Sequence, residues 1–416
     1  MTRLSIREKI KKLGPGVITG AADDDPAGIA TYSIAGAQFG TALLWMSVVS
    51  WPLMATVQGM CARIGMVTGK GLMSALRVRF PRPVLIVLCF ALLAANMINI
   101  GADLSGMADA AQLLTGVNSH LFVIAFGVAI AYATVRLRYV KLANTLKWLA
   151  LVLVAYVITA FMVGPNWPTV AHDTFLPGIP ERGAWSMIVA ILGTTISPYL
   201  FFWQASQEVE EEKSIGRASV STRRGATPEE LSLRRWDIGA GTFVSTGAMF
   251  FIMLTTALTL HANGITNLST SRDVAQALKP FAGRFATLLY AVGLIGTGAL
   301  AIPTLAGSAS YAFAELFGWH QGMDESFRKA PAFYATLVVA VVSGISMDFA
   351  NISPIQAMYW SAVVNGLLAP FLLIGILVVA SDRKLMQGLP SPWLPRAVVG
   401  LTMVAMFVAA IAMFLV

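Results

Sequence analysis

The chain has 416 residues, of which 56% are hydrophobic and only 12% are charged. A soluble chain of this length would divide into domains with charged surfaces, so the composition excludes an ordinary soluble protein. The formal net charge is +8. Because the basic residues lie in short segments between apolar stretches and do not form one patch, we expect no nucleic-acid partner.

Apolar stretches of about 20 residues, the length at which a helix crosses a bilayer, recur along the whole chain. They predict an all-α integral membrane protein. A basic segment precedes the first stretch, but no small-residue cleavage site follows it, so we expect this stretch to be retained as the first span. We predict eleven transmembrane helices, at residues 14–38, 41–66, 84–114, 119–136, 145–164, 184–206, 237–262, 285–314, 331–348, 352–380 and 394–416.

The basic residues are distributed unevenly between the two sides that these helices define. If the N-terminus is cytoplasmic, 25 of the 29 Lys and Arg residues fall in cytoplasmic segments and four fall outside. This asymmetry is what the positive-inside rule predicts. We therefore expect a multi-pass protein of the cell membrane (inner or plasma membrane), with a cytoplasmic N-terminus and an external C-terminus.

The first predicted helix, GPGVITGAADDDPAGIATYSIAGAQFG, carries Asp23, Asp24 and Asp25 midway along an apolar stretch, directly before Pro26. A charged residue at this depth costs about 3 kcal/mol on insertion scales, so an intramembrane carboxylate indicates a functional site. Pro26 removes a backbone donor, which should unwind the helix and free carbonyl oxygens beside Asp25. The pattern predicts a cation site at this break. Asp23 and Asp24 fit equally well into a water-filled vestibule, where they would only raise the local cation concentration.

A second break is predicted at Pro198 in the sixth helix, AILGTTISPYLFFWQ. Pro26 and Pro198 fall in the first helix of two sets of five, helices 1–5 and 6–10, which start on opposite sides of the membrane. Paired interrupted helices at matching positions of inverted repeats indicate a transporter with its site between the repeats. We therefore divide the chain into a first repeat (1–164), a second repeat (165–380) and a C-terminal helix (381–416).

The long polar segment 208–237 is predicted to form a cytoplasmic loop within the second repeat. Its glutamates are followed by sequence rich in Ser, Arg and Gly, which is typical of a solvated, partly flexible loop. A regulatory cation site at these glutamates is the alternative. They are Glu208, Glu210, Glu211 and Glu212.

The first helix resembles, position by position, that of the Nramp divalent-metal transporters, whose pattern is Gly-Pro-Gly, an apolar stretch and then Asp-Pro-Gly-Asn. The sixth helix looks like the Met-Pro-His break of that family, and Asp103 matches an acidic position of its third helix. The resemblance covers the whole chain and implies a LeuT-like 5+5 inverted repeat with broken helices 1 and 6 plus one extra C-terminal helix. The matching positions in the two broken helices are Gly14, Pro15, Gly16, Asp25, Pro26, Ala30, Thr31, Gln38, Phe39, Gly40, Gly193, Thr195 and Pro198.

The sequence departs from the family pattern where side chains would hold the ion. The family Asn is Gly28, the Met before the second Pro is Ser197, and the two histidines are replaced by Tyr199 and Gln204. A thioether favours soft transition metals, whereas carboxylate, carbonyl, hydroxyl and water oxygens suit Mg²⁺ and Mn²⁺. These departures are similar to those of the Nramp-related magnesium transporters, a divergent branch. The resemblance implies import of partly hydrated Mg²⁺, and also Mn²⁺, by alternating access.

Carried over by position, Asp25 and the carbonyl of Ala190 would line the ion site, with Gly28 and Ser197 at the lost ligand positions. Gln356 in the tenth helix would add an oxygen, although polar packing explains it equally well. Asp103 is either a proton-relay acid or a group bonded inside the bundle. Because both family histidines are absent, we expect transport without strong proton coupling. The membrane potential alone supplies about 4.6 kcal/mol per 100 mV for a divalent ion.

Two alternatives keep this fold, namely a proton-coupled Mn²⁺/Fe²⁺ transporter of the ordinary Nramp type and an amino-acid carrier. The acids at the first break would repel a substrate carboxylate, which argues against the amino-acid carrier. We expect no enzymatic activity, because no His-Glu-x-x-His or Gly-x-Ser-x-Gly motif lies at membrane depth. We also expect no cofactor, a divalent cation and the lipid bilayer as partners, and a monomer.

Overall fold

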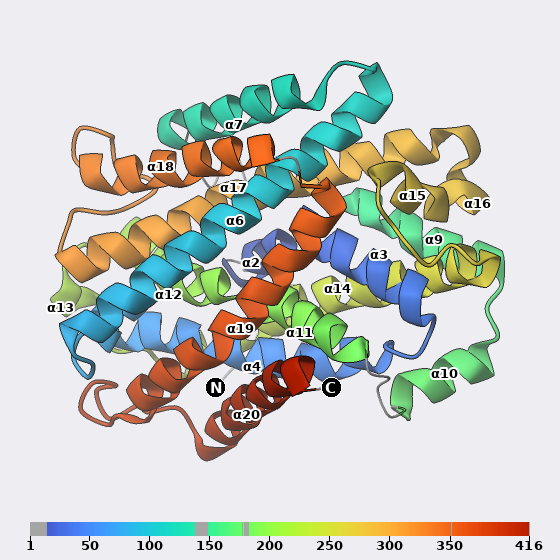
Figure 1. The fold of residues 1–416 in the computed structure, drawn as a ribbon. Helices are drawn as coiled ribbons and strands as arrows, with labels where there is room; N and C mark the ends of the chain where they lie inside the picture. The colour runs from blue at the N-terminus through green and yellow to red at the C-terminus, as the bar shows by residue number, and fades with distance from the viewer. Residues whose placement is uncertain (1–14, 138–148, 177, 179–182, 351, 416) are drawn as a thin grey trace.

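The computed structural model describes residues 15–137, 149–176, 178, 183–350 and 352–415. All regular secondary structure in these residues is helical, which confirms the predicted all-α class (Figure 1). The basic segment before the first helix, and with it the predicted placement of the N-terminus, lies outside the described residues. So do Gly14, Arg138, Lys141, Lys147 and Arg182 of the motif and charge arguments.

In the described part of the chain, eight helical stretches are long and apolar enough to cross a membrane. They contain α6 (Arg82–Thr115), α7 (Ser119–Arg136), α11 with α12 (Ala184–Thr195 and Pro198–Ser214), α14 (Pro228–Thr259), α17 (Ala286–Phe317), α18 (Pro331–Met347), α19 (Pro354–Ser381) and α20 (Trp393–Leu415). The other three predicted spans contain α2 with α3 (Pro15–Asp23 and Pro26–Phe39), α4 (Trp45–Thr68), and η1 with α9 (Leu149–Leu153 and Val154–Val163). The number of membrane crossings remains a prediction.

Both predicted breaks are confirmed. The first helix ends at Asp23 and restarts at Pro26, and the sixth ends at Thr195 and restarts at Pro198. Each second half begins with proline, which lacks an N–H and has a fixed φ, so it suits the first position of a helix and not its interior.

The two broken helices lie within the bundle and are surrounded by long helices from both halves of the chain. The half-helix α2 packs against α14, and α3 packs against α14, α19 and α11. On another side α6 runs beside α17, α18 and α19, while α20 covers α19 (Figure 1). This packing places α6, α14 and α19 where their side chains can reach the first break.

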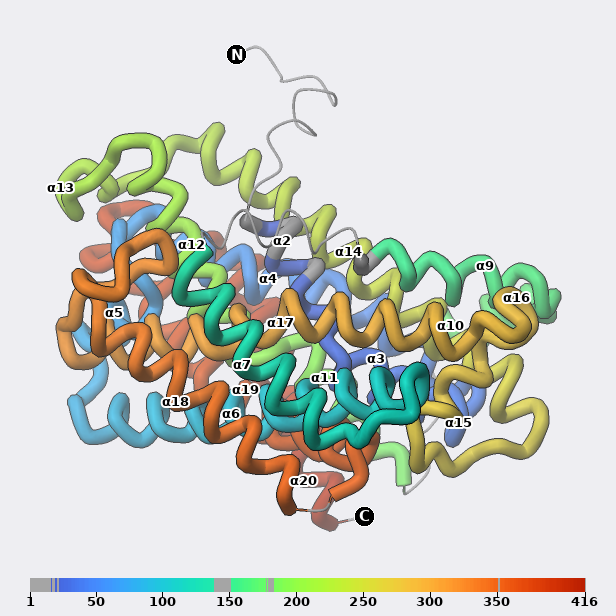
Figure 2. Tube along the Cα trace, turned by 90° about the horizontal axis from the view of Figure 1, so that it is seen from above, coloured from blue at the N-terminus to red at the C-terminus, as the bar shows by residue number. Residues whose placement is uncertain are grey.

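Short helices mark the two ends of the bundle. At one end lie α5 (Leu72–Leu76) and α13 (Val220–Arg223), and at the other lie α10 (Trp167–Phe175), α15 (Ser271–Ala275) and α16 (Lys279–Ala282) (Figures 1 and 2). In the predicted topology the first end is cytoplasmic and the second external. We refer to them as the inner end and the outer end.

The loop predicted at 208–237 is shorter in the structure, because both ends of this segment are helical. Helix α12 continues to Ser214, and α14 already begins at Pro228, where Thr227 and Glu230 form a capping box. All four glutamates have basic partners, which also leaves no support for the regulatory cation site. Arg234 pairs with Glu208 at 2.8 Å and with Glu211, Glu210 pairs with Lys213 at 2.8 Å, and Glu212 pairs with Arg217 at 2.7 Å.

Candidate ion-binding site

Asp25 lies between the two halves of the first broken helix and caps the second half. Its Oδ1 accepts a hydrogen bond from the backbone N–H of Gly28 at 2.7 Å, a common N-cap interaction. Its Oδ2 accepts a hydrogen bond from Nδ2 of Asn99 on α6 at 3.0 Å. The side chain is buried. The break therefore holds a carboxylate in a defined orientation inside the bundle.

Asp103 joins the same cluster from α6. Its Oδ2 lies 3.1 Å from Nδ2 of Asn99, so one amide nitrogen bridges the carboxylates of Asp25 and Asp103. Its Oδ1 accepts a hydrogen bond from the backbone N–H of Ala27 at 3.2 Å. Asp103 is thus bonded inside the bundle, directly at the first break.

Asn99 and Asn365 belong to the cluster, and sequence reasoning missed both. Nδ2 of Asn365 on α19 donates to Oδ1 of Asn99 at 3.2 Å, and both side chains are buried. Oδ1 of Asn365 has no hydrogen-bond partner among the described residues. The spacing of Asn99 and Asp103, four residues apart on one helix face, is a signal that could have found Asn99.

Asp23 and Asp24 face a different helix. The hydroxyl of Ser245 on α14 lies 2.7 Å from Oδ2 of Asp23 and 3.0 Å from Oδ1 of Asp24. Both side chains are buried, so in this conformation neither lines an open vestibule. Oδ1 of Asp23 has no hydrogen-bond partner among the described residues.

No basic side chain of the described residues pairs with this cluster. Four buried carboxylates lie at or beside the first break, and within the described residues none of them forms an ion pair with Lys, Arg or His. A buried charge without a partner is expensive, so the cluster favours a bound cation or protons. In the same residues, no three His, Cys, Asp or Glu side chains are grouped closely enough to hold a metal. An ion here therefore needs amide, hydroxyl, carbonyl or water oxygens as further ligands.

The second break is uncharged. The hydroxyl of Ser197 donates to the carbonyl oxygens of Gly193 and Thr194 at 2.7 and 2.8 Å. The hydroxyl of Tyr199 donates to the carbonyl oxygen of Ala22 at 3.1 Å and so connects the two breaks. Gln204 is turned toward the inner end, where its Nε2 donates to Glu208 at 2.6 Å.

The structure places the other three residues that were predicted to line the ion site, Gly28, Ala190 and Gln356, in different surroundings. Gly28 lies where α3 approaches α11, and a Cβ there would be 3.1 Å from Oγ1 of Thr194 and 3.3 Å from Oδ1 of Asp25. Ala190 is buried on α11. Gln356 is exposed in the first turn of α19, so its assignment to the ion site is wrong. The α19 side chain that reaches the cluster is Asn365, more than two turns further along the helix.

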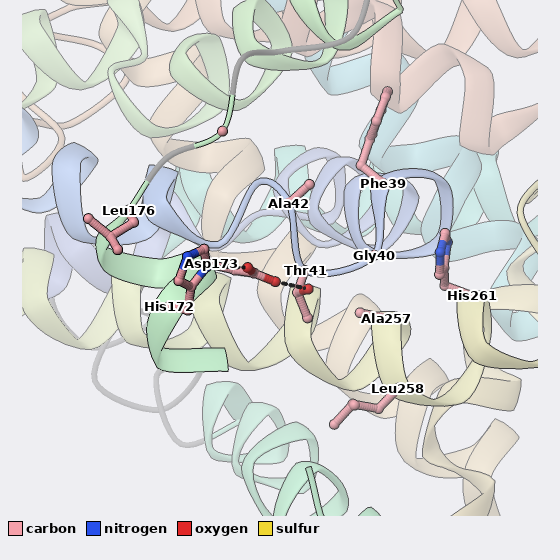
Figure 3. A pocket seen from close by; sticks show the side chains of 11 residues that line it. Phe39, Gly40, Thr41, Ala42, His172, Asp173, Leu176, Ala257, Leu258 and His261 are labelled. Atoms are coloured by element: carbon pink, nitrogen blue, oxygen red, sulfur yellow. Dashed lines mark hydrogen bonds and ion pairs between the residues drawn. The ribbon is translucent and has the colours of Figure 1, made fainter. Parts of the chain in front are cut away.

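A separate cavity of about 340 Å³, the outer pocket, lies at the outer end between α10 and the C-terminal ends of α3 and α14. Asp173 on one side accepts a hydrogen bond from the hydroxyl of Thr41, and His261 lies on the opposite side (Figure 3). The hydrogen bond from Thr41 lowers the pKa of the Asp173 carboxyl. The hydrogen bond between Thr41 and Asp173 connects α10 to the segment that follows α3.

Comparison with known proteins identifies consistent matches over nearly the whole chain. The family described as natural resistance-associated macrophage protein-like matches residues 16–416. Two proteins named divalent metal cation transporter MntH are similar. The one from Aeromonas hydrophila is 25% identical over 91% of this chain and 89% of its own length. The one from Deinococcus radiodurans is 26% identical over 92% and 85%.

Solved structures show the same fold at low sequence identity. A crystal structure of the Eremococcus coleocola manganese transporter has a TM-score of 0.78 and 18% identity, over 98% of this chain and 87% of that one. The inward-facing structure of Mhp1 has a TM-score of 0.56 and 15% identity, over 97% and 90%. These likenesses confirm the predicted fold class.

Proposed function

The chain belongs to the natural resistance-associated macrophage protein-like (Nramp) family of divalent metal cation transporters, and we propose that its principal cargo is partly hydrated Mg²⁺. It is a membrane transporter and not an enzyme, and the metal ion is its substrate and not a cofactor. The finer proposal has three parts: Mg²⁺ is preferred over transition metals, Mn²⁺ is also carried, and uptake proceeds by alternating access without strong proton coupling.

The observation that carries the Mg²⁺ preference is the chemistry of the groups at the two breaks. The first break offers carboxylates and the amides of Asn99 and Asn365, all of which contain hard oxygen ligands. At the second break, where the family pattern has a thioether, Ser197 offers a hydroxyl that is bonded to its own helix. Hard oxygens suit Mg²⁺, which gives up its hydration shell reluctantly and is usually bound through one or two carboxylates together with waters.

The position of Asn99 supports two roles for its amide group, one toward the carboxylates and one toward an ion. Its amide nitrogen lies between the carboxylates of Asp25 and Asp103 and carries the partial positive charge that a cation would replace. An amide has a donor end and an acceptor end of the same shape, so a half-turn of Asn99 would direct its oxygen toward an ion. Asn365 can follow this half-turn, because its unpartnered Oδ1 would then accept from the turned nitrogen.

The proposal of weak proton coupling rests on the residues at the former histidine positions. Tyr199 and Gln204 have no group that titrates near neutral pH, in contrast to histidine. Tyr199 instead donates to Ala22 across the two breaks, and Gln204 bonds to Glu208 away from them. The membrane potential suffices for accumulation, since a divalent ion gains about 4.6 kcal/mol per 100 mV.

The test is ion flux into liposomes that contain the full-length protein. We expect Mg²⁺ uptake that rises with an inside-negative potential, competition by Mn²⁺, and no metal-dependent acidification of an internal pH dye. Uptake of Mn²⁺ with acidification and without Mg²⁺ competition would establish the proton-coupled Mn²⁺/Fe²⁺ alternative instead. Uptake of an amino acid in place of either metal would overturn the metal assignment.

A further inference from the structure

A groove of about 260 Å³ lies near the inner end, away from the ion site. Its walls come from α4, the first part of α14 and the segment that enters α20. Apolar side chains form most of the walls, among them Met60, Met66, Leu231 and Ile238, and Arg63, Arg234 and Arg235 also line it. The groove therefore offers apolar walls that suit a hydrocarbon chain and positive charge that suits an anion.

Only part of this charge is neutralised within the described residues. Arg234 forms ion pairs with Glu208, Glu211 and Asp237. Arg63 and Arg235 form no ion pair with a described acidic residue, and the one hydrogen bond described for Arg63 runs from its Nε to the carbonyl oxygen of Leu389 at 3.1 Å. Two guanidinium groups therefore leave about two positive charges on the groove.

A buried hydroxyl at the same groove also lacks a partner. Ser391, in the segment between α19 and α20, is 2% exposed, and its Oγ has no hydrogen-bond partner among the described residues. A buried polar group without a partner costs about 1–3 kcal/mol, so a ligand that accepts from this hydroxyl would remove that cost. A donor hydroxyl beside two arginines suits an anionic oxygen ligand.

Two tryptophans locate the groove relative to the lipid. Trp236 follows Arg235 on α14 and is 60% exposed, and Trp393 at the start of α20 is 71% exposed. Exposed tryptophans at the ends of membrane helices are typical of the boundary between hydrocarbon and headgroups. The arginines therefore lie at headgroup depth, with the apolar walls continuing toward the hydrocarbon.

We infer that this groove binds one anionic phospholipid, with its phosphodiester against Arg63 and Arg235 and an acyl chain along the apolar walls. Guanidinium groups bind phosphate oxygens with two parallel hydrogen bonds, and Ser391 supplies a further donor. A free phosphate ion would use the arginines but not the apolar walls, whereas a zwitterionic lipid would place its own cation near theirs. The inference is independent of which ion the protein carries.

Native mass spectrometry of the full-length protein, titrated with dioleoyl-phosphatidylglycerol, tests this inference. The Arg63→Gln/Arg235→Gln variant is expected to bind the lipid about 30-fold more weakly, which corresponds to about 1 kcal/mol for each arginine. The matched control is Arg82→Gln/Arg328→Gln, which removes the same charge from two exposed arginines outside the groove. The control should bind like the wild type.

A second variant tests the groove without touching its charge. Gly59 lines the groove, and a Cβ there would meet no atom within 4 Å, so Gly59→Leu places an apolar side chain at the groove from a position with space at its base. It should weaken lipid binding by about tenfold while both arginines remain. Equal binding of phosphatidylcholine, displacement of the lipid by excess inorganic phosphate, or wild-type binding by the Gly59→Leu variant would each overturn the inference.

Discussion

The two helix breaks arise from the same local cause and differ in almost everything that surrounds them. At the first break, Asp23, Asp24 and Asp25 are buried and take their hydrogen bonds from α6, α14 and the start of α3. At the second break, Ser197 returns its hydroxyl to carbonyls of its own helix, and no charged side chain is present. A proline interrupts each of the two helices, but only the first break carries acidic side chains.

This difference between the two breaks indicates that they have different roles in transport. We propose that the first break supplies charged ligands, because carboxylates inside the membrane are costly unless a cation compensates them. In this proposal the second break supplies backbone carbonyls. Its Tyr199 also donates a hydrogen bond to Ala22 and so connects the two breaks. Substitutions at the first break should therefore abolish transport, whereas those at the second should alter selectivity.

The largest effect is expected for Asp25→Asn, which keeps the shape of the side chain and removes its charge. Changes to residues that merely orient a metal ligand cost about 10- to 100-fold, so loss of the charged ligand should lower liposome uptake of Mg²⁺ by about 100-fold or more. Asp109→Asn, on α6 but bonded to the backbone of Ser271, is the control and should retain transport. Normal uptake by Asp25→Asn would show that the ion binds elsewhere.

The next effect tests the amide beside that carboxylate. Asn99→Leu should raise the KM for Mg²⁺ by about tenfold with a smaller change in maximal rate, because the residue donates to both carboxylates and, after the proposed half-turn, would offer an oxygen to the ion. Asn96 is the matched control. It is an equally buried asparagine one turn away on α6, whose Nδ2 donates to Leu305 and Ser308 at 2.8 Å. Asn96→Leu should lower thermal stability and leave KM unchanged, and equal KM values for the two variants would contradict this role of Asn99.

The parts of this contrast that were predictable from sequence depend on local chemistry. Pro26 and Pro198 interrupt a helix whatever packs around them, and Asp25 sits next to the interruption. The partners of Asp25 were not predictable in this way, because Asn99 and Asn365 lie on other helices and a single Asn in an apolar helix fits packing equally well. Which residue of α19 reaches the cluster depends on how the helices pack in space, so the sequence pattern points to the exposed Gln356 and not to Asn365.

The segment 208–237 also shows that sequence does not reveal contacts between separate helices. Its composition predicts a solvated loop, because composition describes only residues that are neighbours in sequence. Glu208 is nevertheless 1% exposed, because Arg234 reaches it from the next helix at 2.8 Å. The capping pair Thr227 and Glu230, by contrast, is a sequence pattern from which the start of α14 was predictable.

At the second break, Ser197→Met restores the thioether of the family pattern. We expect the ratio of Mn²⁺ to Mg²⁺ uptake to rise by about tenfold, equivalent to about 1.4 kcal/mol, because a soft ligand favours transition metals. Ser197→Ala separates two causes, since it removes the same hydrogen bonds to Gly193 and Thr194 without adding sulfur. If Ser197→Ala changes the ratio equally, the hydroxyl and not the missing thioether sets the selectivity.

The smallest effect concerns the outer end of the first broken helix, where Thr41 donates to Asp173 (Figure 3). This hydrogen bond lowers the pKa of the Asp173 carboxyl, so its stabilising effect is present above the ordinary aspartate pKa and is lost only as the pH falls through the lowered value. Amide hydrogen exchange at residues 39–42, corrected for intrinsic rates, should stay constant down to about pH 4 and accelerate below it. Thr41→Val should accelerate exchange about two- to threefold at neutral pH, and Thr41→Ser should not. Unchanged exchange in Thr41→Val would contradict this role of the Thr41 hydroxyl and point to His172, whose Nδ1 lies 3.1 Å from Asp173, as the group that holds the carboxylate.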